Sequence, residues 1–85
     1  MAERSQNTGR TVPLVNLASG EKGIIVQLPM DSLLVRRLVS CGLLPGVEVM
    51  VERRTPALIV QAGAARIALD RRTAAGIMVF AGGEQ

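Results

Sequence analysis

Apolar and polar residues alternate along several short segments of this chain, and a period of two predicts half-buried β-strands. The clearest case is residues 47–52, where three valines alternate with Glu48, Met50 and Glu52. Further strands are predicted at 23–28, 58–61, 66–69 and around 77–79, and residues 14–17 form a short extended piece. About five short strands favour a mainly β fold, a small barrel whose closure removes edge strands.

One segment has helical spacing instead. Asp31 or Ser32 can cap its N-terminus by accepting the first backbone N–H groups. Apolar residues then recur at intervals of one, three and four, which predicts a helix whose buried face is formed by Leu34, Val35, Leu38 and Cys41. A second, single capped turn of helix is predicted at residues 70–73.

Glycines mark the predicted turns. Gly42 follows the last helical turn and suits the left-handed position that ends many helices. Pro45 and Gly46 suit the two central positions of a type II turn. Gly20 and Gly23 bound a further turn in which a positive φ is useful. We expect these glycines to be structural and not ligand-binding.

The composition fits one small globular domain, with 85 residues, 48% apolar and 20% charged. Because both ends lack apolar anchors, we expect flexible tails at 1–12 and 81–85 around a folded domain at 13–80. Mean hydropathy is +0.32, but the longest charge-free stretches, 55–65 and 73–83, are too short for a spanning helix. The first ten residues do not resemble a secretory signal. We expect a cytoplasmic protein that does not insert into membranes.

Missing residue types exclude several chemistries. Cys41 is the only Cys and there is no His, so the chain cannot form an internal disulfide, a Ser-His-Asp or Cys-His triad, or a clustered zinc site. No Gly-rich phosphate-binding motif is present. We therefore predict no enzyme activity, no cofactor and no catalytic or metal-binding residues. Cys41 is interpreted as a small buried residue of the helix, and a metal site between two molecules stays open.

The helix-to-strand passage at residues 37–49, RLVSCGLLPGVEV, resembles the most specific motif of the FeoA family, R-L-x-x-x-G-L-x-P-G-x-x-V. The opening of the family is matched by Leu17, Gly20, Gly23 and Ile25, and its end by the stretch 67–79. The resemblance covers residues 14 to 80. Its structural motif residues are Gly20, Gly23, Leu38, Gly42, Leu43, Pro45 and Gly46.

The resemblance implies an SH3-like barrel with an inserted helix, a fold that also closes iron-dependent repressors of the diphtheria-toxin-repressor type. It further implies a small cytoplasmic accessory protein of ferrous iron uptake that binds and regulates the cytosolic region of the FeoB transporter. In one respect the chain departs from the family. The loop Thr55-Pro56-Ala57 is shorter than the usual Gly/Asp-containing hairpin loop, so any partner contact made by that loop must be made differently here.

Three pairs of adjacent arginines stand out in a chain with a net charge of +3. They belong either to a solvated surface or to a docking surface for an acidic partner, since guanidinium groups pair bidentately with carboxylates. Out-facing methionines and the single aromatic residue can add apolar contacts or fill the core. Met30 and Met78 belong to this apolar set, and the residues predicted to bind a partner are Arg36, Arg37, Arg53, Arg54, Arg71, Arg72, Met50 and Phe80.

An alternative function is a small basic barrel that binds nucleic acid. Single-stranded nucleic acid is usually bound on several aromatic side chains, and this chain has only Phe80. The composition therefore favours a protein partner over nucleic acid, and leaves weak self-association open.

Overall fold

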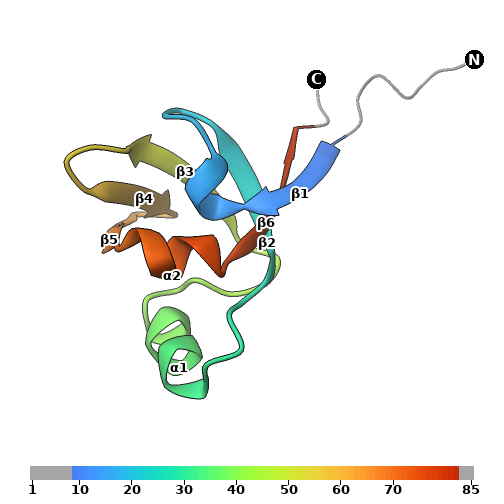
Figure 1. Cartoon of the computed structure of the whole chain (residues 1–85), viewed down its shortest axis with the longest axis vertical. Coiled ribbons are helices and arrows are strands. Elements are labelled where there is room, and N and C mark those ends of the chain that lie inside the picture. Colours follow the sequence, from blue (N-terminus) through green and yellow to red (C-terminus); the bar gives the residue numbers. More distant parts are fainter. Residues whose placement is uncertain (1–8, 83–85) are drawn as a thin grey trace, which may run out of the picture.

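The computed structural model describes residues 9–82 and contains six strands and two α-helices (Figure 1). Their bounds are β1 Gly9–Pro13, the 3-10 helix η2 Leu14–Asn16, β2 Lys22–Gln27, α1 Ser32–Ser40, β3 Glu48–Arg53, β4 Leu58–Ala62, β5 Ala65–Leu69, α2 Arg71–Ala75 and β6 Met78–Gly82. The strands form one antiparallel sheet in the order β1-β6-β2-β3-β4-β5. A mainly β fold with one main helix is therefore confirmed.

The alternating pattern buries one face of each central strand. In β3, Val49 and Val51 are buried while Met50 between them is half-buried, as the period of two predicts. A two-residue turn at Gly63 joins β4 to β5, with Ala62 opposite Ala65. The core is aliphatic and consists of Leu14, Leu17, Ile25, Leu38, Leu43, Val49, Val51, Leu58, Val60, Ala62, Ala74, Ile77, Val79 and Ala81.

The sheet is not closed into a barrel, so the predicted removal of edge strands does not occur. Within residues 9–82, β1 pairs only with β6, and β5 pairs only with β4. Between these edges, η2 and α2 pack against each other, and their Leu14 and Ala74 are fully buried. The Leu14 N–H also donates to the Ile77 carbonyl at 2.8 Å. Two short helices therefore cover the part of the core that the open sheet leaves uncovered.

The structure moves three predicted boundaries. The sheet includes residues 9–12 and 81–82, which the sequence placed in tails, because β1 finds a partner in β6 at the other end of the chain. The remaining parts of the expected tails, residues 1–8 and 83–85, lie outside the described residues. Residues 14–16 form a 3-10 turn and not an extended piece, and the Leu17 N–H closes it by donating to the Leu14 carbonyl at 3.1 Å.

Both ends of α1 are stabilised locally. At the N-terminus, the Asp31 carboxylate accepts the Leu34 N–H at 3.1 Å, so Asp31 is the cap. At the C-terminus, Gly42 has a φ of +90°, and its N–H donates to the Val39 carbonyl at 2.9 Å. The Leu43 N–H donates to the Leu38 carbonyl at 2.9 Å, which completes a Schellman motif and directs the Leu43 side chain into the core.

The two remaining glycine turns differ in kind. Gly46 has a φ of +92°, and the Val47 N–H donates to the Leu44 carbonyl at 3.1 Å, as the predicted type II turn requires. Gly20 also has a positive φ. Gly23 does not: the expected turn does not extend to it, whereas the strand predicted from residue 23 is present as β2. Gly23 lies inside β2, where a Cβ would approach the Val79 Cβ to 3.0 Å, so it permits close packing of two strands.

Helix α1 lies at the lower end of the molecule in Figure 1, below α2 and away from the sheet. Only Leu38 of this helix is fully buried, and Leu34 and Val35 are half-buried. The predicted inner face is therefore correct for these three residues and wrong for Cys41, which is exposed. The helix ends at Ser40, so Cys41 occupies the cap position at the open end of the groove that it lines with Leu34 and Leu38.

Candidate functional site

The six paired arginines do not form one basic surface, because two of them hold the framework together. Arg54 is half-buried, and its Nη1 donates to the carbonyl oxygens of Val15, at 2.7 Å, and of Leu17. Arg71 donates from Nη2 to the Arg54 carbonyl. These bonds tie β3 to the η2 segment and α2 to the end of β3. Arg54 and Arg71 are thus engaged with backbone, contrary to the expectation that both are free to bind a partner.

The other four arginines are exposed, and Arg36, Arg37 and Arg53 line separate grooves. Within residues 9–82, Arg36, Arg37, Arg53 and Arg72 make no side-chain hydrogen bond or ion pair; the two ion pairs found there join Arg10 to Glu21 and Arg66 to Glu52. Arg36 lines one flank of α1, and Arg37 faces β5 and α2 across a groove of about 170 Å³. Arg53 lies on the outer face of the sheet beside Arg66. Each groove therefore contains only one of these four arginines.

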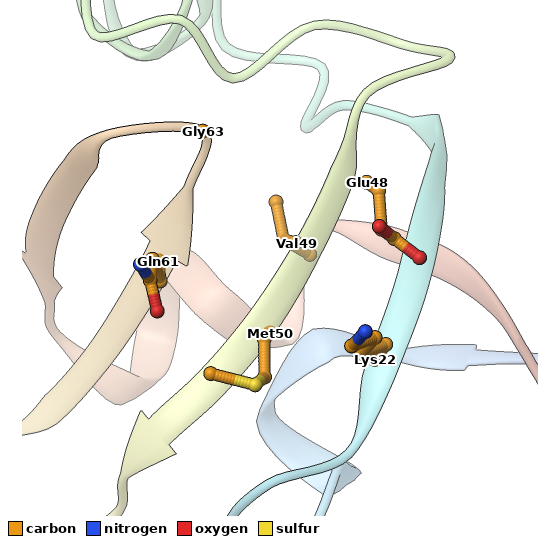
Figure 2. Close-up of a pocket in the computed structure, with 6 residues that line it drawn as sticks. All are labelled: Lys22, Glu48, Val49, Met50, Gln61 and Gly63. Atoms are coloured by element: carbon orange, nitrogen blue, oxygen red, sulfur yellow. The ribbon is translucent and has the colours of Figure 1, made fainter.

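Met50 belongs to a polar hollow of about 310 Å³ on the outer face of β2, β3 and β4 (Figure 2). Lys22 and Gln61 lie on either side of Met50 in register, and Glu48 lies along the same strand. One ammonium, one amide and one carboxylate can bind a polar group, but this set contains no nucleophile beside a base. The hollow can therefore hold a ligand weakly but is not equipped for catalysis.

Phe80 lies on the outer face of β6 and is 42% exposed. It is opposite Thr11 on β1 and Ile24 on β2, and its ring covers Gly9, where no Cβ would fit. An aromatic ring over an edge-strand glycine shields the backbone there. Phe80 thus has a structural role as well as an exposed edge, and the half-buried Met78 lies nearby on the same strand.

A surface on α1 joins the predicted contact residue Arg36 and the apolar Met30 to residues that were not predicted to bind. The α1 groove, about 550 Å³ in volume, is lined by Pro29, Met30, Ser32, Val35, Arg36 and Val39. Met30 is 95% exposed, and Leu33 on the outer side of the helix is 70% exposed. The signal in the sequence is that Leu33 and Val39 fall outside the predicted buried face. Such a concentration of exposed large apolar side chains is unusual for a monomer surface and is typical of an interface.

No group of three or more His, Cys, Asp or Glu side chains capable of holding a metal ion occurs in residues 9–82. Cys41 is exposed and lines the groove between α1 and β5 with Arg37 and apolar residues. In the described part of the chain, no helix is long and apolar enough to cross a membrane.

One carboxyl group has a shifted pKa. Hydrogen bonding to the Thr73 side chain, in the first turn of α2, holds the pKa of Asp70 below its ordinary value, and the nearby Arg72 acts in the same direction. Asp70 stands at the N-cap position of α2, so its charged form suits the local backbone. This shift has a structural cause and does not indicate a catalytic acid.

The chain was compared with known proteins. The model of the FeoA domain matches residues 12–80. An iron uptake regulatory protein (FeoA) with a known crystal structure is 33% identical to this chain in sequence, and the two structures match with a TM-score of 0.76. The match covers 82% of this chain and 95% of that one. The FeoA protein of Chlorobium tepidum is 25% identical with a TM-score of 0.78, covering 82% and 70% of the two chains. None of the curated proteins matches significantly.

Other solved structures share the fold of this chain. The zinc-bound FeoA of Stenotrophomonas maltophilia is described as a prokaryotic SH3-domain protein and a candidate activating factor of ferrous iron transport. It is 26% identical with a TM-score of 0.69, covering 78% of this chain and 86% of that one, which confirms the SH3-like fold. A manganese-dependent transcriptional repressor shares only the fold, at 20% identity. The FeoA model matches most of the length of this chain. This chain therefore belongs to the FeoA family, whose members are associated with ferrous iron transport.

Proposed function

We propose that this chain is a cytoplasmic accessory protein that binds the cytosolic region of a FeoB-type ferrous iron transporter and regulates it. Family membership supports the link to ferrous iron transport. The observation that carries the proposal of a binding role is the set of exposed apolar side chains beside exposed arginines, led by Met30, Leu33 and Arg36. Apolar contact with flanking arginine is the usual composition of a protein-binding surface.

The proposed contact residues are a subset of those predicted from the sequence. Arg36, Arg37, Arg53 and Arg72 remain candidates because their guanidinium groups are exposed, as do the out-facing Met50 and Phe80. Arg54 and Arg71 leave this set because their guanidinium groups bind backbone carbonyls. Because Arg36, Arg37 and Arg53 line three different grooves, they do not form one basic path of the kind that favours the alternative, nucleic-acid binding.

We further propose that the protein acts by binding and performs no reaction itself. Titration calorimetry with the purified cytosolic domain of the FeoB-type transporter of the same organism, with and without guanine nucleotide, tests the proposal. We expect a micromolar complex, because the exposed surfaces are small and transient interfaces are correspondingly weak. Absence of any heat of binding up to about 100 μM domain, in both nucleotide states, would refute the proposed function.

A further inference from the structure

We propose that α1 is the docking site and that its occupant is an acidic amphipathic helix of the partner protein. The inference rests on the proposed function for the identity of the partner, the transporter's cytosolic region, and adds the surface and the kind of segment that binds there. The α1 surface is defined as the α1 groove together with Leu33.

The first argument is the packing of α1. Only Leu38 of its nine residues is fully buried, and the helix lies apart from the sheet in Figure 1. A helix of this length is not stable alone, so Asp31 and the Schellman motif at Gly42 hold it in place at its two ends. The fold therefore maintains a helix most of which contributes little to the core.

The second argument is the pattern on the exposed side. Val35 and Val39, one turn apart, line the α1 groove together with the nearly fully exposed Met30. Leu33 shares the outer side of the helix with Arg36, three residues further on. A groove with apolar residues one turn apart accepts the apolar ridge of another helix, and a flexible methionine adapts to its side chains.

The third argument is charge. Within residues 9–82, Arg36 and Arg37 form no ion pair: Asp31 accepts a backbone N–H as the helix cap, and Asp70 lines the groove that Arg37 lines without pairing with it. A second copy of this chain would bring the same arginines together across a two-fold axis, which is repulsive. A partner helix with Asp or Glu beside its apolar ridge fills the groove with apolar side chains and pairs its carboxylates with the guanidinium groups.

The size of the surface sets the affinity. A nine-residue helix is about 14 Å long, so the partner helix makes contact over about two and a half turns. The area that a helix of this length can bury is below that of a standard stable interface and corresponds to a transient, micromolar complex. Arg36 also makes the association dependent on salt, because the pair is formed near solvent.

The test uses two substitutions on the α1 surface and a matched control for each. Leu33→Asp places a charge on the outer side of α1, and Val26→Asp does the same at a position on β2 that is 46% exposed. Arg36→Glu reverses a charge on α1, and Arg10→Glu does so on β1, at a residue outside the proposed contact set whose exposed pair with Glu21 contributes little to stability. All four side chains are exposed, so circular dichroism and melting temperature should show folded proteins.

Binding of the purified transporter domain is then measured by calorimetry for the five proteins. We expect Leu33→Asp and Arg36→Glu each to weaken binding at least about tenfold, and both controls to stay within about threefold of the original chain. Added salt should weaken the original complex more than that of Arg36→Glu.

The other outcomes overturn the inference. If the original chain binds and both α1 substitutions bind normally, docking lies elsewhere while the proposed function stands. If the original chain does not bind the domain, both the docking inference and the proposed function fail. The original chain could also fail to bind the domain and instead self-associate or sediment with anionic vesicles, with Leu33→Asp abolishing that behaviour. The occupant of the α1 surface would then be a second copy of the chain or a membrane surface, and not a partner helix.

Discussion

Replacing Arg54 by Met tests the assignment of this arginine to the framework. The substitution keeps an apolar stem of similar length and removes the guanidinium group that binds the carbonyl oxygens of Val15, at 2.7 Å, and Leu17. Leu17 is fully buried and Val15 packs against the core, so the segment that Arg54 holds is part of the core. Loss of the guanidinium therefore weakens the attachment of this segment to β3.

The magnitude follows from the two hydrogen bonds. Each bond to a charged group contributes about 1.5–3 kcal/mol where water is excluded. Because Arg54 is only half-buried and the carbonyl oxygens can regain water, we expect about 2–3 kcal/mol for both bonds together. In a domain of this size, that corresponds to a decrease in melting temperature of about 10–20 °C.

The assay is urea and thermal unfolding followed by far-UV circular dichroism. Arg53→Met is the matched control, because Arg53 is the adjacent residue, is exposed and makes no side-chain hydrogen bond within residues 9–82. The control should change the free energy of unfolding by less than about 0.5 kcal/mol. If Arg54→Met is no more destabilising than the control, water replaces the guanidinium without loss, and the framework role of Arg54 is refuted.

Four further predictions concern the turns and caps. Gly46→Val should lower the free energy of unfolding by about 1–2 kcal/mol, because a φ of +92° is strained for a residue with a Cβ; an unchanged urea midpoint would contradict this. Gly23→Ala should cost about 1–3 kcal/mol in the same assay through crowding against β6, and a neutral effect would mean that the strands separate easily. Asp31→Ala should cost about 1 kcal/mol and speed amide exchange in the first turn of α1, whereas unchanged exchange would disprove the cap. Since the pKa of Asp70 is lowered in the folded state, its ionised form stabilises the fold above the ordinary carboxyl pKa; this stability should be lost as the pH falls below about 4, and Thr73→Ala should reduce that loss in acid titrations of unfolding.

Features made by a few neighbouring residues were predictable from the sequence. The cap at Asp31, the helix end at Gly42 and the type II turn at Gly46 each depend on hydrogen bonds between residues at most five positions apart. The backbone conformation of such a turn is decided by the absence of a Cβ or by a short polar side chain. The alternation in β3 was equally visible, because one face of a strand must be apolar wherever it covers a core.

Features that depend on distant partners were not predictable. Gly23 looks like a turn residue until β6 brings the Val79 side chain close to it. Arg54 looks like a surface residue until the carbonyls of residues 15 and 17 lie within reach. Cys41 has the spacing of a buried helical residue, but the helix ends one position earlier. Each error arises because local pattern carries no information about which segment, tens of residues away, supplies the contact.

The candidate site also combines features that the sequence predicts with features that only the tertiary structure shows. The sequence by itself determined the aliphatic core, the strand pattern, the excess of arginine and the absence of histidine, since these are properties of composition and period. Only the tertiary structure decided which arginines remain exposed, that the sheet stays open between β1 and β5, and that α1 presents Met30 and Leu33 to solvent. Exposure is a property of how elements pack, and packing joins residues that are far apart in the chain.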